Sequence, residues 1–226
     1  MERYERQILL EEINHDGQQK LEHARVLIVG AGGLGSPIAL YLAAAGVGHI
    51  GLVDDDKVNI SNLQRQIIYT ESELGAYKSM AAASRLHKLN SRIKVEPIVC
   101  RLNETNAEDI IGRYDVIVDG CDNFETRYTL DAVCHQLGKP YVYGAVQGFE
   151  GQVSVFDKAH QTLRYRDLYP EPFHDVSKAI VGMTAGVVGC IQAHEVIKIV
   201  CGYGEVLYNR LWITDLRTMQ SNIIEL

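Results

Sequence analysis

The sequence lacks the patterns that mark several common protein classes. Its five cysteines stand at positions 100, 121, 134, 190 and 201, and no two of them are separated by only two residues. This spacing excludes a zinc knuckle of the Cys-x-x-Cys type, and the odd number argues against a disulfide framework. No uninterrupted apolar run reaches the length of about 18 residues that a membrane-spanning helix needs.

An excess of basic charge is also missing. The 226 residues include 22 lysines and arginines against 29 aspartates and glutamates, a net charge of -7, so we expect no nucleic-acid or membrane partner. The first residues, Met1 to Gln7, are mostly polar or charged and contain no apolar signal core. We therefore expect a cytoplasmic protein with a single domain over residues 1–226, which begins with an amphipathic helical segment at about residues 1–23.

Strand-like and helix-like segments alternate through the first two thirds of the chain. Buried strands are predicted at 25–30, 49–54, 94–99, 115–119 and 141–145, and helices at 34–45, 76–89, 106–111 and 124–137. Further on, 151–156 reads as a half-buried antiparallel strand, 157–178 as a long loop, 183–201 as an apolar helix, and 211–215 and 221–224 as closing strands. The pattern predicts an α/β fold, Rossmann-like, with a mostly parallel sheet, flanking helices and antiparallel strands added in the C-terminal half.

The most informative segment is a glycine-rich turn between the first strand and the first helix. Gly30, Gly32 and Gly35 match the Gly-x-Gly-x-x-Gly spacing, and Gly33 lies between them. Such a turn lets backbone N–H groups and a helix N-terminus approach a phosphate. Asp54 ends the second strand 24 residues after Gly30, where a carboxylate can accept hydrogen bonds from ribose hydroxyls. The pattern predicts a nucleotide site without identifying the nucleotide.

Polar residues after the second strand favour a triphosphate over a dinucleotide. Arg65 offers a planar fork that matches phosphate oxygens, Asn62 adds a neutral donor, and Lys78 opens the next helix. Each alone would be an ordinary surface residue. Together with the glycine turn, they would neutralise several negative charges in one cleft.

Acidic residues follow the fourth strand, at a sheet edge where ligands commonly bind. Asp122 is placed to hold Mg²⁺, which favours one or two carboxylates together with phosphate oxygens, and Asp119 is a competing candidate. The alternative is that Asp122 or Asn123 caps the helix at 124–137.

Taken together, these motifs closely resemble the E1-like adenylyltransferases of the ThiF/MoeB/HesA superfamily, relatives of ubiquitin-activating enzymes. The matching stretches cover nearly the whole chain in the family's order: 3–7, 30–35, 54–66, 75–78, 119–123, 144–153 and 192–202. A ThiF-like member is the best match.

The resemblance implies an enzyme that uses Mg²⁺ and ATP to adenylylate a small ubiquitin-like sulfur carrier. The carboxylate of the carrier's C-terminal Gly-Gly tail would attack the α-phosphate, giving an acyl-adenylate and pyrophosphate. The resemblance assigns the phosphates to the glycine turn with Asn62, Arg65 and Lys78, the ribose to Asp54, and Mg²⁺ to Asp122. It adds Gln66 and Asn123 to the ATP-binding residues. Arg6 matches the family arginine that enters the neighbouring protomer's site, which implies a homodimer.

Two departures from the family pattern limit the resemblance. Where members often carry the first of two zinc-binding cysteine pairs, this chain has Arg164 to Asp167, so we expect no zinc. The position of the cysteine that joins the carrier in some relatives falls at about Asp175, and Cys190 lies inside the following helix. This argues against a covalent intermediate with the carrier, and sulfur transfer would depend on a separate donor protein.

Three alternatives remain at this stage. The first is the same chemistry on a MoaD-like carrier for molybdopterin in place of a ThiS-like carrier for the thiamin thiazole. The second is an NAD-dependent oxidoreductase, which Gly-x-Gly-x-x-Gly alone would suggest. The third is a non-catalytic E1-like subunit, against which the joint presence of Arg6, Arg65, Lys78 and Asp122 argues.

Overall fold

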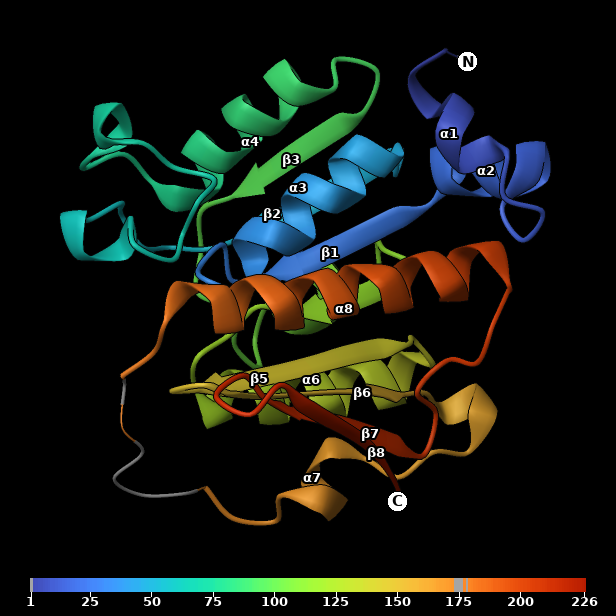
Figure 1. Ribbon diagram of the computed structural model, residues 1–226. Coiled ribbons are helices and arrows are strands. Elements are labelled where there is room, and N and C mark those ends of the chain that lie inside the picture. Colours follow the sequence, from blue (N-terminus) through green and yellow to red (C-terminus); the bar gives the residue numbers. More distant parts are fainter. Residues whose placement is uncertain (1, 173–176, 178) are drawn as a thin grey trace.

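A computed structural model describes residues 2–172, 177 and 179–226. Its strands form one eight-stranded sheet in the order β3-β2-β1-β4-β5-β6-β7-β8 (Figure 1). The strands are β1 (Arg25–Val29), β2 (His49–Val53), β3 (Lys94–Ile98), β4 (Val116–Asp119), β5 (Tyr141–Gln147), β6 (Glu150–Phe156), β7 (Arg210–Asp215) and β8 (Gln220–Glu225). Strands β1 to β5 pair in parallel and β5 to β8 antiparallel, which confirms the predicted fold class.

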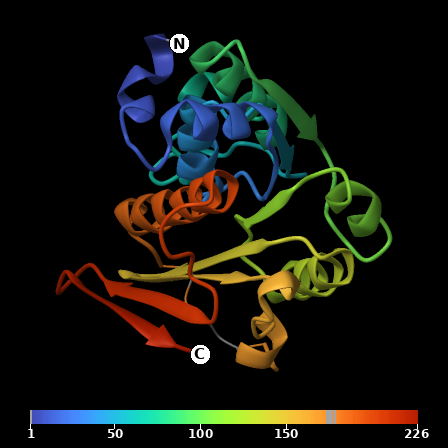
Figure 2. The ribbon, with the colours of Figure 1, turned by 90° about the vertical axis from the view of Figure 1, so that its right-hand side faces the viewer.

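Helices cover both faces of the sheet. The α-helices are α1 (Glu5–Ile8), α2 (Asn14–His23), α3 (Gly35–Ala45), α4 (Lys78–Leu89), α5 (Ala107–Ile111), α6 (Phe124–Leu137), α7 (Tyr165–Leu168) and α8 (Gly182–Cys201). One apolar core joins the sheet to α3, α4 and α8, and a second lies against α5 and α6. Figure 1 shows α8 across the front of the sheet, and the view in Figure 2 separates the two layers.

The predicted loop at 157–178 contains more regular structure than its sequence suggested. A short 3-10 helix, η4 (Lys158–His160), and α7 lie within it, so the prediction of a wholly irregular loop was wrong for these residues. Asp157 accepts a hydrogen bond from the N–H of Ala159, and Asp167 closes a capping box at Arg164. These contacts span two or three residues and leave no apolar period.

Helix α8 is the longest helix of the described chain. By length and composition alone it would be able to cross a membrane. In the fold it packs against α3, β5 and β6, and it buries Gln192, Glu195 and Lys198. It therefore serves as a core helix of this fold.

The register brings the ends of three strands to one place. Val29 of β1 lies beside Val53 of β2 and Asp119 of β4. The chain passes outward from β1 to β3 and then returns to β4, so β1 and β4 flank the point where the strand order reverses. In open α/β sheets, ligands bind beyond the carboxyl ends of the strands at this point.

Candidate functional site

The glycine turn after β1 is packed tightly against the loop that follows β4. Gly30 has a φ of +95°, and a methyl group there would lie 2.5 Å from the carbonyl oxygen of Gly120. A methyl group at Gly35 would overlap the carbonyl oxygen of Gly30. The first glycine therefore permits the turn, and Gly35 lets α3 start directly against the strand.

Replacing Gly35 with alanine is expected to lower the free energy of unfolding by about 1–3 kcal/mol, because the backbone must move to admit the methyl group. Urea unfolding measures the change. Gly186→Ala is the matched control, since nothing lies within 4 Å of a methyl group at that helical position. The control should be neutral or gain up to about 1 kcal/mol. Equal stability of Gly35→Ala and the wild type would contradict the close approach.

Asp54 joins the glycine turn to the segment after β2. Its Oδ2 accepts the N–H of Ala31 at 2.8 Å, and its Oδ1 accepts the N–H of Asp56 at 2.8 Å. Burial raises the pKa of the Asp54 carboxyl, while these two N–H groups and Lys78 act in the opposite direction. A carboxylate oxygen can accept more than one hydrogen bond, so Asp54 keeps acceptor capacity for hydroxyl groups.

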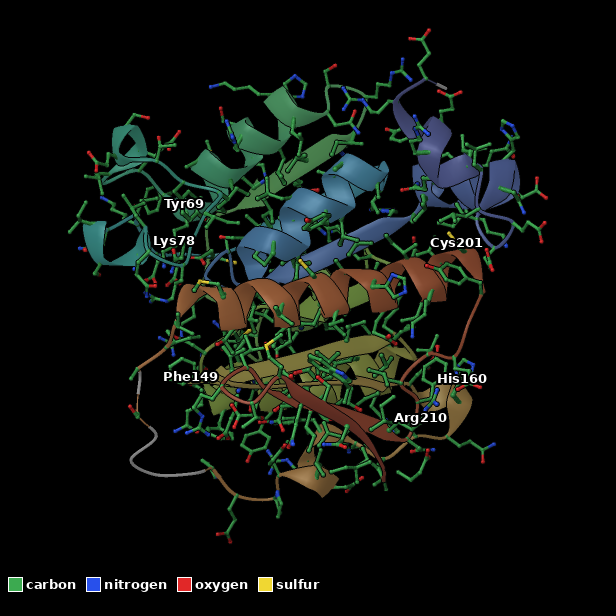
Figure 3. The ribbon with its side chains drawn as sticks, viewed as in Figure 1. Tyr69, Lys78, Phe149, His160, Cys201 and Arg210 are labelled. Atoms are coloured by element: carbon green, nitrogen blue, oxygen red, sulfur yellow. The ribbon has the colours of Figure 1, made fainter. Side chains whose placement is uncertain are left out.

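Two cations lie beside this turn. Nζ of Lys78 lies 2.9 Å from Oδ2 of Asp56, and Figure 3 shows Lys78 next to Tyr69. Arg65 donates to the carbonyl of Ser61 at 3.0 Å, and a methyl group at Gly33 would lie 3.5 Å from its Cγ. The structure thus places two cations beside the glycine turn, one of which is paired with Asp56.

Gln66 adds a buried amide to the same place. Its Oε1 has no hydrogen-bond partner among the described residues. Its Nε2 would lie 3.6 Å from a methyl group at Gly32. A buried polar group without a partner is costly, so this amide is available to a ligand at the turn.

The sequence reasoning did not find Tyr69. This buried side chain donates its hydroxyl hydrogen toward the carbonyls of Ala31 at 2.8 Å and Lys78 at 3.2 Å. Burial raises the pKa of the Tyr69 hydroxyl, with the charge of Asp54 adding to the effect. Tyr69 therefore ties the glycine turn to the start of α4, and the only local signal was one tyrosine after two isoleucines.

Asp119, the competing metal candidate, is occupied within the protein. It is fully buried, and its carboxylate accepts from Arg127 at 2.9 Å, the Tyr141 hydroxyl at 3.0 Å and the N–H of Cys121 at 2.7 Å. Arg127 is a second residue that sequence reasoning missed. Since all of these donors already occupy Asp119, the exposed Asp122 is the better placed of the two carboxylates to meet a metal ion.

The helix-cap alternative applies to Asn123. Its side chain accepts the N–H of Thr126 at 2.9 Å and so caps α6. Asn123 still borders the cleft described next, which leaves its amide nitrogen available.

A cleft of about 1230 Å³ unites most of the predicted residues. Nine of them line it: Gly30, Gly32, Gly33, Asp54, Arg65, Gln66, Lys78, Asp122 and Asn123. The cleft continues over the outer sheet, where Tyr143, Gln152, Tyr165, Ile213 and Asn222 border it. Its volume exceeds the roughly 300–1,000 Å³ of typical ligand pockets, so it is large enough for a nucleotide together with a second substrate.

Three predicted residues are not among the described residues that line the cleft. Gly35 lies behind the turn in α3, and the Asn62 side chain accepts the N–H of Asn59 at 3.0 Å. Arg6 is exposed on α1. The position of the family cysteine, Asp175, lies outside the described residues.

The described residues contain no group of three or more His, Cys, Asp or Glu side chains able to hold a metal ion. Asp122 and Asn123 border the cleft with side-chain oxygen donors, the kind of ligand that suits a hard cation such as Mg²⁺.

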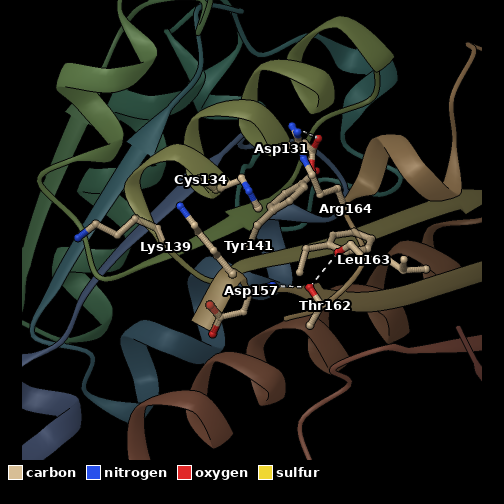
Figure 4. Close-up of a pocket in the computed structure, with 11 residues that line it drawn as sticks. Asp131, Cys134, Lys139, Tyr141, Asp157, Thr162, Leu163 and Arg164 are labelled. Atoms are coloured by element: carbon tan, nitrogen blue, oxygen red, sulfur yellow. Dashed lines mark hydrogen bonds and ion pairs between the residues drawn. The ribbon is translucent and has the colours of Figure 1, made fainter. Parts of the chain in front are cut away.

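A second cavity, between α6 and the segment before α7, has a volume of only about 10 Å³ (Figure 4). Asp131, Cys134, Tyr141 and Arg164 are among the residues that line it. This volume is at the limit of what one water molecule needs, so the cavity cannot hold a substrate.

Comparison with known proteins gives one family for nearly the whole chain. The model of the ThiF family matches residues 4–226. The probable adenylyltransferase/sulfurtransferase MoeZ of Mycobacterium tuberculosis is 43% identical over 231 residues, which cover 98% of this chain and 59% of MoeZ. The sulfur carrier protein adenylyltransferase of Thermus thermophilus is 41% identical over 227 residues, covering 95% of this chain and 83% of that relative. The chain thus spans less than two thirds of MoeZ.

Solved structures share the fold. A crystal structure of E. coli MccB with ATP is 24% identical with a TM-score of 0.84, covering 92% of this chain and 66% of MccB. A structure of MccB with MccA-N7isoASN has a TM-score of 0.88 at 23% identity, covering 99% and 71%. At this identity the likeness concerns the fold alone.

Proposed function

Because the chain belongs to the ThiF family, we propose that it is an ATP-dependent adenylyltransferase whose substrate is the C-terminal Gly-Gly carboxylate of a ubiquitin-like sulfur carrier. The observation that carries the proposal is the convergence of Asp54, Arg65 and Lys78 with the glycine turn in one cleft. The names of the Thermus relative and of the SAMP-activating enzyme E1 of Haloferax volcanii, 40% identical over 97% of this chain, support it.

In the proposed reaction, a carboxylate oxygen of the carrier tail attacks the α-phosphorus of ATP. The bond from that phosphorus to the bridging oxygen breaks, and pyrophosphate leaves with the electron pair. Arg65 and Lys78 would neutralise the charge on the phosphates, while Asp54 would fix the ribose. Mg²⁺, when bound, supplies further charge neutralisation, and Asp122 would hold it.

The outer part of the cleft suits an extended peptide tail. Gln152 donates to the hydroxyl of Tyr143 at 2.7 Å, while Tyr165 is buried with a hydroxyl that has no hydrogen-bond partner among the described residues. Tyr143 belongs to β5, Gln152 to β6 and Tyr165 to α7, and all three line this part of the cleft. A peptide ending in Gly-Gly would meet hydrogen-bonding groups here without needing side-chain pockets.

For the carrier, we propose a ThiS-like protein of thiamin-thiazole synthesis, with a MoaD-like carrier as the second candidate. The second is favoured by one relative, the probable molybdopterin-synthase adenylyltransferase of Porphyra purpurea, 43% identical over 212 residues, covering 91% of this chain and 55% of that relative. We also propose a homodimer, because the exposed Arg6 lies outside the cleft of its own chain and would reach the cleft of a second copy.

ATP–pyrophosphate exchange tests the proposal. With MgATP, radiolabelled pyrophosphate and either carrier, we expect label to enter ATP only when the carrier ends in Gly-Gly. A carrier without its last glycine is the matched control. No carrier-dependent exchange with either carrier would refute the function, and tight NADH binding in a fluorescence titration would favour an oxidoreductase.

A further inference from the structure

Lys78 is held on several sides by the protein. Its backbone N–H donates to the carbonyl of Asp56 at 2.9 Å, and its own carbonyl accepts from the hydroxyl of Tyr69 at 3.2 Å. Its ammonium lies 2.9 Å from Oδ2 of Asp56. The side chain proposed to meet the triphosphate therefore already has an anionic partner.

The two members of this ion pair differ strongly in exposure. The Lys78 side chain is 8% exposed and the Asp56 side chain 72%. Moving the lysine would cost many contacts, whereas the Asp56 carboxylate can rotate fully into water, because most of its side chain is already exposed. When a second anion reaches Lys78, Asp56 is the partner that leaves.

Asp54 holds the backbone of Asp56 in place. One Asp54 oxygen accepts the N–H of Asp56, and the other accepts the N–H of Ala31 in the glycine turn, each at 2.8 Å. The Asp56 carboxylate is therefore placed beside the phosphate-facing turn. Asp55 also lines the cleft and is exposed, yet it forms no ion pair among the described residues.

We propose that Asp56 is an internal competitor for Lys78: its carboxylate occupies the lysine until a phosphate oxygen displaces it, and returns when pyrophosphate leaves. The inference rests on the proposed function, since it assumes that Lys78 meets the phosphates of ATP. Asp56 would weaken the binding of triphosphate and pyrophosphate alike, and would keep the buried ammonium paired before and after the reaction.

The alternative to competition is that Asp56 orients the Lys78 side chain. If Asp56 merely held Lys78 in a productive position, its loss would weaken phosphate binding. The two roles thus predict opposite signs for the same substitution.

Isothermal titration of the full chain with pyrophosphate and with MgATP, without carrier and at fixed ionic strength, separates these roles. We expect Asp56→Asn to bind pyrophosphate about three- to tenfold more tightly than the wild type. Asp55→Asn removes the same charge next door and should change binding less than about twofold. Asp56→Ala, which also removes the hydrogen-bond acceptor, should tighten binding at least as much as Asp56→Asn.

A double-mutant cycle identifies the partner. In a Lys78→Met background, Asp56→Asn should no longer tighten binding, because the competition needs the lysine. The inference would be overturned if Asp56→Asn bound pyrophosphate more weakly than the wild type, or if its gain in affinity were no larger than that of Asp55→Asn. In that case, MgATP binding by the wild type would leave the proposed function intact. A folded wild-type chain that binds no MgATP would overturn both.

Discussion

Replacing Lys78 with methionine is expected to lower the rate of carrier-dependent ATP–pyrophosphate exchange by about 10²–10³-fold, the usual cost of removing one group that stabilises transition-state charge. The ammonium is nearly buried at the start of α4, next to the glycine turn. In such surroundings a fixed charge acts more strongly on phosphate oxygens than it would in water. Methionine keeps the length and apolar volume of the side chain, so the fold should persist.

Initial rates of exchange at saturating carrier measure this loss, and thermal unfolding checks the fold. Lys57→Met is the matched control, because Lys57 is exposed and its ammonium lies 5.1 Å from the centre of the Tyr77 ring. The control should retain nearly full exchange. An active Lys78→Met variant would remove Lys78 from the proposed mechanism.

The same variant tests whether Arg6 acts across a dimer. Arg6→Ala and Lys78→Met chains should each be nearly inactive, for different reasons. If each cleft needs Lys78 from its own chain and Arg6 from the other copy, a mixed dimer contains one complete cleft. Mixing the two variants should then restore about one quarter of wild-type exchange, as random pairing makes half of the dimers mixed. No recovery on mixing would contradict the role of Arg6 across the dimer.

Much of the framework could be predicted because its signals are local. Helix α6 has the predicted bounds, since Asn123 caps its start and Gly138, with a φ of +62°, ends it. The glycine turn and the carboxyl ends of the strands likewise follow from short patterns.

The side-chain pairs around the cleft could not be predicted in this way. The Tyr69 hydroxyl donates to the carbonyl of Ala31, 38 residues away in the sequence, and Lys78 donates to Asp56, 22 residues away. No periodicity specifies such partners, because they depend on how strands and loops meet in three dimensions. Asp119 shows the consequence: by sequence it competed for the metal, but in the fold it is enclosed by protein donors.

Because protein donors enclose Asp119, we expect the loss of its cationic partner Arg127 to have a large effect on stability. Arg127→Met should lower the free energy of unfolding by about 3–5 kcal/mol, because it leaves the fully buried Asp119 without its cation. Arg127 also donates to the carbonyls of Cys121 at 2.8 Å and Gly144 at 3.2 Å, and these acceptors would lose their partner as well. Although burial alone would lower the pKa of Arg127, the charge of Asp119 raises it well above the usual value.

Urea unfolding monitored by circular dichroism measures this effect. Arg101→Met is the control, because its ion pair with Glu125 is 61% and 78% exposed and should contribute less than about 1 kcal/mol. Arg127→Lys keeps the charge but not the fork of donors, and we expect an intermediate loss that leaves the chain folded. A loss for Arg127→Met no larger than that for Arg101→Met would contradict the role of the buried pair.

The Arg127→Lys variant should also need more Mg²⁺ for half-maximal exchange. Arg127 donates to the carbonyl of Cys121, the residue directly before Asp122, so its replacement should hold the loop that carries Asp122 less firmly.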